Sequence, residues 1–455
     1  MKNIHNISSV GGNYYLYNME ECIFQLIHPE MNKIFSRHVN KTEEVSLYYI
    51  NKYKYWINNN IFIEKNVKNE ISTLNDSIVK NSLLSTPQLT FEVTEKCNLK
   101  CSYCIYSDIY SNHDHRESKN MNFSMAKNII DYYFYTLKEN NHANEKLDIG
   151  FYGGETLLNF ELVKSIVSYL KTKYADKCKY NFHIITNGVY LNLYYDFLIK
   201  NEFNILISLD GDEKSSSYRF GHKTYVKIIK NINYIKEKYP IYFENNINFN
   251  AVLHNRNSID SINNFFISNY NKTPIITPLN PFGINPVYKK AFRSIESSAK
   301  NKNTKNGNKL KFITEYSKLT KSIFGAYSDY LDLLSDKRYT RIIPTGTCLP
   351  FGKKTFITVK GKILPCERIG HNFQLGVINN EKTNIDFHKI TNMYNNLYKL
   401  VYDKNCSKCY LFSRCSLCMF HIENNRCNSF CNKKGFNEYL KQKIDFFELH
   451  RDYIK

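Results

Sequence analysis

The chain has 455 residues, a formal net charge of +20 and 13 cysteines. It contains no amino-terminal signal segment and no apolar stretch of about 18 residues, so we expect a cytoplasmic protein that does not contact a membrane. Cysteines of a cytoplasmic protein that cluster at 97–104, 348–366 and 406–431 indicate metal binding rather than disulfides. The positive charge would attract nucleic acid or an acidic polypeptide, but no compact basic run stands out, which favours a lysine-rich surface.

Residues 1–85 predict a small module of strands followed by helix. Residues 13–27 favour two short strands and residues 42–60 favour a helix, and the polar stretch 68–82 is expected to be a linker. Such a module could be a structural cap, a nucleic-acid-binding winged helix or a peptide-recognition domain.

Residues 86–298 alternate short apolar runs with longer amphipathic ones. The expected strands are 87–93, 147–153, 181–186, 203–209, 247–253 and 274–279. The clearest helical patterns fall between them, at 124–139, 159–174 and 225–239. Repeated strand–helix units predict an α/β fold with a parallel sheet, here a partial (β/α)6 barrel similar to a TIM barrel, with functional residues at the carboxyl ends of the strands.

The remaining residues divide into two parts. Residues 299–344 are expected to form a polar loop at 299–309 and a long helix at 310–334. Residues 345–455 are rich in cysteine and turns and predict a metal-stabilised carboxyl-terminal domain that ends in a helix.

Three cysteines follow the first barrel strand, with the spacing C-x3-C-x2-C at Cys97, Cys101 and Cys104. Structural zinc needs four ligands. Three thiolates in one loop suit a cubane iron–sulfur cluster that leaves its fourth iron open for a small molecule. After the second strand, Gly153 and Gly154 would let a ligand approach the backbone, and a carboxylate in the same turn could accept from a ligand amine.

These residues resemble the radical S-adenosylmethionine (SAM) enzymes, whose cluster loop has an aromatic residue before its last cysteine, here Tyr103. The resemblance implies that SAM binds the open iron, is cleaved by one electron and yields a 5′-deoxyadenosyl radical. It also implies residues that hold SAM: Gly153, Gly154 and Glu155 for the methionyl amine, Ser208 and Arg219 for the carboxylate, and Leu253 for the adenine. Two departures are Thr156, where the family more often has Pro, and an interval before Arg219 that is one residue short.

The later cysteines could hold two further cubane clusters, with zinc as the competing use. Their pattern resembles the SPASM extension of radical SAM enzymes that modify peptides. That resemblance implies a nearer auxiliary cluster on Cys348, Cys366 and Cys418 and a farther one on Cys406, Cys409 and Cys415, completed by Cys427 or Cys431. The last interval is x2 where the commoner pattern has x3, and the extra cysteine leaves the ligand sets open.

Among such relatives, anaerobic sulfatase-maturing enzymes usually have Asp after the second SPASM cysteine and Gln before the Gly-Gly-Glu run. This chain has Glu367 and Tyr152 at those positions, which favours maturation of a ribosomal peptide. The resemblance therefore implies a radical SAM peptide maturase that joins cysteine sulfur to carbon in a cysteine-rich precursor, with Glu367 as a candidate base or as the ion-pair partner of Arg368 or a lysine. The expected partners are the precursor, its leader bound by the amino-terminal module, and a flavodoxin- or ferredoxin-type electron donor. The alternatives are formylglycine formation, another peptide modification such as epimerisation, and a zinc-rich nucleic-acid-binding protein.

Overall fold

The computed structural model describes residues 4–18, 23–36, 45–61, 71–139, 146–296 and 346–407, with short stretches at 409, 412, 417–421, 440–441, 444–445 and 448. The chain divides into two compact units. The first comprises Met1–Thr73, Asn303–Thr347 and Asn396–Lys455, and the second comprises Leu74–Lys302 and Cys348–Asn395.

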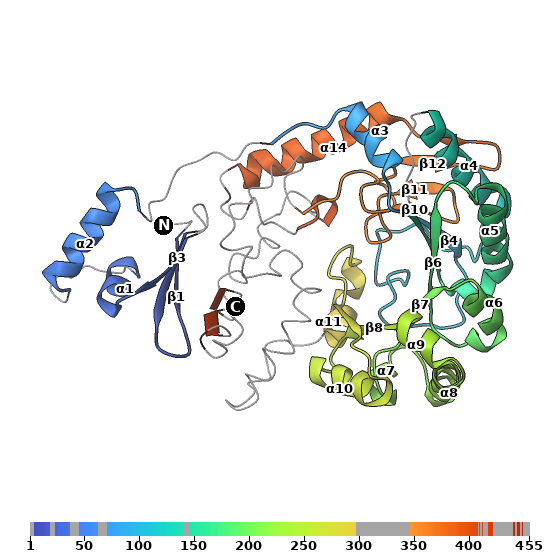
Figure 1. Ribbon diagram of the computed structural model, residues 1–455, viewed down its shortest axis with the longest axis horizontal. Coiled ribbons are helices and arrows are strands. Elements are labelled where there is room, and N and C mark those ends of the chain that lie inside the picture. Colours follow the sequence, from blue (N-terminus) through green and yellow to red (C-terminus); the bar gives the residue numbers. More distant parts are fainter. Residues whose placement is uncertain are drawn as a thin grey trace. The chain divides into compact units, whose positions relative to one another are not determined.

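The second unit is built on a twisted sheet whose strands β4 to β9 are parallel neighbours in chain order (Figure 1). These strands are β4 (Gln88–Thr94), β5 (Lys146–Gly153), β6 (Lys179–Thr186), β7 (Asn204–Ser208), β8 (Ile247–Leu253) and β9 (Ile275–Pro278). Each overlaps a strand that the sequence predicts. Leu89, Phe91 and Val93, which alternate with polar residues along β4, are fully buried, as expected for apolar residues that share one face of a strand.

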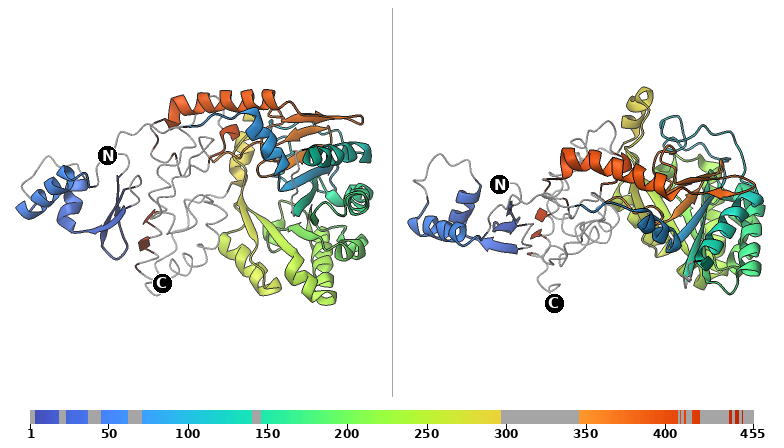
Figure 2. Two further views of the ribbon diagram at one scale, coloured as in Figure 1. Left: turned by 45° about the horizontal axis from the view of Figure 1, so that its top comes forward. Right: turned by 90° about the horizontal axis from the view of Figure 1, so that it is seen from above.

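Helices connect the parallel strands and lie along the outer face of the sheet (Figures 1 and 2). They are α4 (Phe123–Glu139), α5 (Phe160–Lys173), α6 (Tyr195–Lys200), α7 (Glu213–Ser216), α8 (His222–Lys238), α9 (Pro240–Asn246) and α10 (Ile259–Tyr270). Helix α11 (Lys289–Ile295) follows β9. The helices predicted at 124–139, 159–174 and 225–239 are α4, α5 and α8. Helix α5 buries Phe160, Val163, Ile166, Val167 and Leu170, which is the stripe that its 3.6-residue periodicity predicts. The architecture is the α/β class expected from the sequence.

The sheet continues past β4 through a carboxyl-terminal segment. Strand β10 (Thr355–Ile357) pairs with β4 in parallel, and an antiparallel meander of β11 (Lys362–Leu364), β12 (Gly376–Ile378) and β13 (Thr383–Asn384) follows. Helix α14 (Phe387–Val401) then leaves the meander. The segment between Cys348 and Cys366 therefore adds β10 and β11 to the same sheet whose strand β4 leads into the first cysteine loop.

The linker expected at 68–82 is wrong in part, because it contains the start of helix α3 (Asp76–Leu84). The Asn75 side chain accepts a hydrogen bond from the backbone N–H of Ile78 and so caps the helix. Val79, Leu83 and Leu84 are buried, which explains why a mostly polar stretch is helical.

The described part of the amino-terminal module is a three-stranded antiparallel sheet followed by two helices. The elements are β1 (Ile4–Ser8), β2 (Tyr14–Asn18), β3 (Ile23–Ile27), α1 (Pro29–Phe35) and α2 (Leu47–Asn58). Sequence analysis predicts β2, β3 and α2 but misses β1 and α1. A small core of Ile4, Leu16, Ile27, Met31, Ile34 and Phe35 holds the module together.

No helix among the described residues is long and apolar enough to cross a lipid bilayer. The helix expected at 310–334 and the loop at 299–309 lie outside the described residues.

Candidate active site

The cysteine loop lies after β4, at the carboxyl end of the parallel strands. Cys97 is exposed, Cys101 and Cys104 are half-buried, and all three are free thiols. In the described ranges, no three His, Cys, Asp or Glu side chains converge closely enough to hold one metal ion. A cubane cluster requires another arrangement, because each thiolate binds a different iron and the sulfurs therefore lie apart. The donor set fits a 4Fe–4S cluster, and it does not supply the four ligands of structural zinc.

Burial raises the pKa of all three thiols, that of Cys101 to about 12. Cys97 and Cys104 also act to raise the pKa of Cys101, which shows that the thiols are electrostatically coupled, while Arg219 opposes them. Iron binding must therefore displace protons from these groups, as it does wherever thiolates bind a metal.

The turn after β5 lies directly against the backbone of the cysteine loop. The Gly154 N–H donates to the Thr94 carbonyl at 2.9 Å, and the Glu155 N–H donates to the Lys96 carbonyl at 2.8 Å. A Cβ on Gly154 would lie 2.3 Å from the Lys96 carbonyl oxygen, and Gly153 has a φ of +151°. Only glycine fits at both positions without displacing the loop.

Glu155 is 1% exposed and its carboxylate is already hydrogen-bonded. One oxygen accepts from the Thr186 hydroxyl at 2.6 Å and from the Leu157 N–H at 3.1 Å, and the other accepts from the Asn187 N–H at 2.7 Å. Burial raises the pKa of Glu155, although these donors oppose the effect. The carboxylate thus joins the β5 turn to the end of β6, and its contact with a ligand amine stays a prediction.

The other residues predicted to hold SAM follow neighbouring strands. Ser208 ends β7, Leu253 ends β8, and both are half-buried at the same edge of the sheet as the cysteine loop. Arg219 follows α7 and pairs with Asp210, with 2.9 Å between Nη2 and Oδ1. Its Nε atom is buried and has no partner among the described residues, so the guanidinium retains a donor for an anion.

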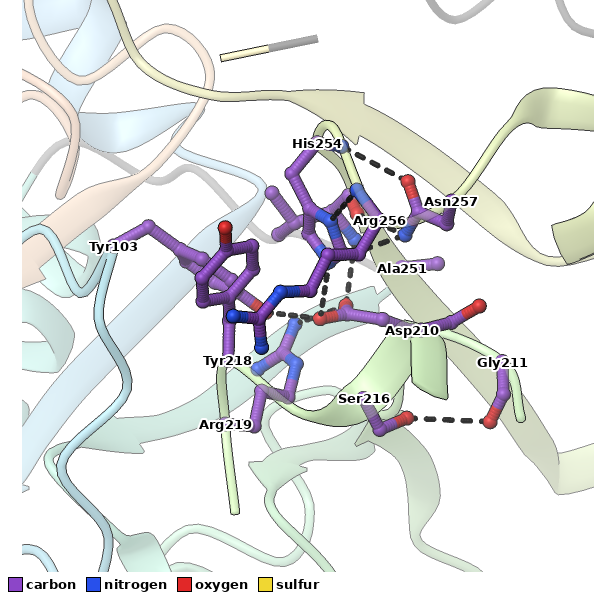
Figure 3. Close-up of polar contacts among 12 residues, drawn as sticks. Tyr103, Asp210, Gly211, Ser216, Tyr218, Arg219, Ala251, His254, Arg256 and Asn257 are labelled. Atoms are coloured by element: carbon purple, nitrogen blue, oxygen red, sulfur yellow. Dashed lines mark hydrogen bonds and ion pairs between the residues drawn. The ribbon is translucent and has the colours of Figure 1, made fainter. Parts of the chain in front are cut away.

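Asp210 is a central residue of the site that sequence reasoning misses. Its carboxylate is fully buried and accepts hydrogen bonds from the Tyr103 hydroxyl and, at 2.8 Å, from the Val252 N–H (Figure 3). His254 Nε2 lies 3.5 Å from the same carboxylate. Burial acts to raise the pKa of Asp210, but Arg219 and these donors hold it below its usual value. The cysteine loop is thereby connected to the ends of β7 and β8.

A second ion pair lies next to the cysteine loop. Arg116 pairs with Glu92 of β4, and its guanidinium lies 3.8 Å from the centre of the Tyr106 ring. The Tyr106 hydroxyl is buried and has no hydrogen-bond partner among the described residues. The Tyr106 ring also contacts the Tyr152 ring, with 6.4 Å between centroids. An unpaired buried hydroxyl is unusual and often marks a functional role or a bound water or ion.

Glu367 lies close enough to both tyrosines to act electrostatically on them. Its carboxylate is 3.1 Å from Lys354 Nζ and 4.0 Å from Arg368 Nε. Burial acts to raise the pKa of Glu367, but Lys354 in particular brings it below its usual value. The ion pair with a lysine that the sequence leaves open is therefore present, and Glu367 is ionised at neutral pH.

The later cysteines are only partly described. Cys348 is exposed, Cys366 is half-buried, Cys406 is buried, and Cys409 and Cys418 are half-buried. Cys415, Cys427 and Cys431 lie outside the described residues. The ligand sets of the auxiliary clusters therefore stay a prediction.

The fold and the cysteine loop define a radical SAM enzyme. The model of the radical SAM superfamily matches residues 91–265, from β4 into α10, so the chain carries a radical SAM domain.

Three known proteins illustrate its relatives. The chain is 26% identical over 363 residues to the radical SAM cyclopropyl synthase TigE of Paramaledivibacter caminithermalis, covering 77% of this chain and 71% of the relative. It is 27% identical over 220 residues to a cysteine-type anaerobic sulfatase-maturating enzyme of Clostridium novyi, covering 44% of this chain and 56% of that enzyme. Among solved structures, native anSMEcpe with bound AdoMet and Cp18Cys peptide is 18% identical with a TM-score of 0.48, covering 79% of this chain and 100% of that one.

Proposed function

We propose that this radical SAM enzyme matures a ribosomally made, cysteine-rich peptide by joining cysteine sulfur to a carbon of another residue as a thioether. The observation that carries the proposal is the unpaired Tyr106 hydroxyl beside Cys104. Tyr152 and Glu367 lie near this hydroxyl, and we expect an acceptor residue of the peptide to bind against it next to the cluster loop. The relatives named as sulfatase-maturating enzymes support a polypeptide substrate.

In this proposal, different residues of the chain have different roles in the reaction. Cys97, Cys101 and Cys104 would hold a 4Fe–4S cluster, and with SAM this cofactor supplies the radical that removes hydrogen from carbon. The Gly153–Glu155 turn, Ser208, Arg219 and Leu253 would bind SAM. Tyr106 would position the acceptor residue, and Glu367 would receive the thiol proton. One C–H and one S–H bond would break and one C–S bond would form, and the surplus electron would pass to an auxiliary cluster held by the later cysteines. A flavodoxin- or ferredoxin-type protein would donate the electron that SAM cleavage consumes.

We propose that the amino-terminal module binds the leader of the precursor as an added strand. Within the described residues β3 pairs only with β2 and is an edge strand of that sheet. Ile23 and Leu26 of β3 are 40% and 55% exposed. An extended peptide can add to such an edge through main-chain hydrogen bonds, and the net charge of +20 would favour an acidic leader.

Formylglycine formation is the second candidate, because two sulfatase-maturating enzymes are among the relatives. Glu367 rather than Asp and Tyr152 rather than Gln argue against it. Ring closure between carbons is a further possibility, because a relative that covers 77% of this chain is named as a cyclopropyl synthase.

The test is anaerobic incubation of the reconstituted enzyme with SAM, reductant and short cysteine-rich peptides encoded beside its gene, followed by mass spectrometry. A thioether removes two hydrogens per link and one alkylatable thiol. Ring closure between carbons removes hydrogens but keeps the thiol, formylglycine converts cysteine to an aldehyde, and epimerisation leaves the mass unchanged. A variant in which Cys97, Cys101 and Cys104 are all Ala is the control and should give none of these products. A modified peptide whose thiols all remain alkylatable would refute thioether formation.

A further inference from the structure

Two arginines flank the cysteine loop, and each lies over a tyrosine of that loop. The Arg219 guanidinium is 5.3 Å from the centre of the Tyr103 ring, and that of Arg116 is 3.8 Å from the centre of the Tyr106 ring. The two tyrosines stand on either side of Cys104 in the sequence. Both arginines therefore contact the loop that carries the thiols.

Each arginine is paired with a buried carboxylate. The Arg219 and Asp210 side chains are 9% and 0% exposed, and those of Arg116 and Glu92 are 17% and 2% exposed. Both carboxylates also accept a backbone N–H, Asp210 from Val252 at 2.8 Å and Glu92 from Val359 at 3.0 Å. Strand ends and backbone donors thus hold both acids in place.

Buried ion pairs add little to the free energy of unfolding, because the cost of removing two charges from water offsets their attraction. They do control the local charge. The Arg219–Asp210 pair lies against the cysteine loop, because the Arg219 carbonyl oxygen is 4.0 Å from Cys101 Sγ and the Ser102 N–H donates to the Tyr218 carbonyl at 2.9 Å. The Arg116 guanidinium donates to the Glu95 carbonyl, two residues before Cys97, at 3.0 Å.

The reduction potential of an iron–sulfur cluster depends on the net charge around it. Reduction adds one negative charge, so an unpaired buried cation beside the thiolates would favour the reduced form and raise the potential. Cleavage of SAM requires a strongly reducing cluster. An arginine is useful here for its donors, but its charge works against that requirement unless a carboxylate cancels it.

We propose that Asp210 and Glu92 are positioning residues that cancel the charges of Arg219 and Arg116 and thereby keep the reduction potential of the cluster low. Asp210 also fixes the Tyr103 hydroxyl, so one carboxylate controls both the charge beside Cys101 and the conformation of the loop (Figure 3). This inference rests on the radical SAM domain and not on the proposed peptide substrate.

The test is a redox titration of the reconstituted cluster, followed by electron paramagnetic resonance without SAM or peptide. At a fixed solution potential, Asp210→Asn and Glu92→Gln should each raise the ratio of reduced to oxidised cluster about tenfold, which is a positive shift of about 59 mV for one electron. The double variant Asp210→Asn with Arg219→Gln removes both charges and should return close to wild type. Tyr103→Phe keeps both charges and should not shift the potential.

The matched control is Asp131→Asn. Asp131 accepts hydrogen bonds from the Tyr169 and Tyr174 hydroxyls and from Lys127 and Lys173, so it resembles Asp210 but lies on α4, in the helical layer. It should lower the melting temperature and leave the potential unchanged.

Iron content and melting temperature separate charge effects from folding. A fully loaded Glu92→Gln protein with the wild-type potential would overturn the proposal, even if Asp210→Asn fails to fold. The same conclusion follows if Asp131→Asn shifts the potential equally, or if the double variant shifts it further than Asp210→Asn.

Discussion

Replacing Gly154 by alanine tests the close contact between the β5 turn and the cysteine loop. The added Cβ would lie 2.3 Å from the Lys96 carbonyl oxygen, 2.7 Å from the Lys96 carbonyl carbon and 2.8 Å from the Glu95 carbonyl oxygen. All three atoms belong to backbone, so no side chain can rotate away. Ordinary contact begins at 3.4 Å, and the loop therefore has to retreat by roughly 1 Å.

That retreat has a cost that can be estimated. Overpacking of this kind typically costs about 1–3 kcal/mol. The hydrogen bond from the Glu155 N–H to the Lys96 carbonyl, 2.8 Å long, would be strained or lost at a cost of about 1 kcal/mol. We expect Gly154→Ala to lower the free energy of unfolding by about 3 kcal/mol or, if the loop yields locally, to lose most of the cluster iron.

The assay is anaerobic thermal unfolding combined with iron analysis after reconstitution. Gly221 is the control, because a Cβ there meets nothing within 4 Å and its position at the start of α8 should cost less than about 1 kcal/mol on change to alanine. Wild-type iron content together with a melting temperature matching that of Gly221→Ala would refute the reasoning.

Three further predictions follow from particular side chains. Partial burial acts to raise the pKa of Asp131, but its lysine and tyrosine donors lower it from 3.8 to about 2. The ionised carboxylate therefore stabilises the fold above pH 3.8, and this stabilisation is lost as the pH falls toward 2. Asp131→Asn should cost about 1 kcal/mol at pH 7, after allowance for solvent screening, and nothing near pH 2, measured by denaturant unfolding at both pH values. Leu26→Glu on β3 should weaken binding of an acidic leader about tenfold, measured by fluorescence anisotropy. Leu193 is 60% exposed in the second unit, and Leu193→Glu should not weaken binding. Equal binding by both variants contradicts leader docking at β3. Glu367→Gln should slow peptide modification about 100-fold while deoxyadenosine still forms, and an unchanged rate would exclude Glu367 as the base.

The parallel strands were predictable because each is a short stretch rich in apolar residues, and helical patterns separate several of them. Strand β10 was not predictable, because a strand of three residues is too short to show a periodic pattern of apolar residues. Its pairing with β4 also joins segments more than 260 residues apart in the sequence. Helix α3 had a signal in Asn75, an N-cap residue before apolar residues at helical spacing. Because its sequence is mostly polar, this stretch appeared to be a linker.

The residues of the site were likewise predictable only where they form a local sequence pattern. The three cysteines and the Gly-Gly-Glu turn are local patterns, and the structure brings them into direct contact. Asp210 lies two residues after Ser208 but was not predictable from the sequence. Its role depends on contacts with Tyr103, Arg219 and His254, which are distant from it in the sequence or belong to no motif. The same is true of Glu92, whose partner Arg116 lies in a loop without any motif.

The parallel pairing of β10 with β4 has a consequence for how the enzyme is made. Until the ribosome has synthesised residues 355–357, β4 has an unpaired edge immediately before the cysteine loop, and such edges invite aggregation. Iron loading of a nascent or truncated polypeptide that ends near residue 296 would therefore start from an incomplete scaffold. The sheet that carries the first cysteine loop is therefore complete only after the last quarter of the chain has been synthesised.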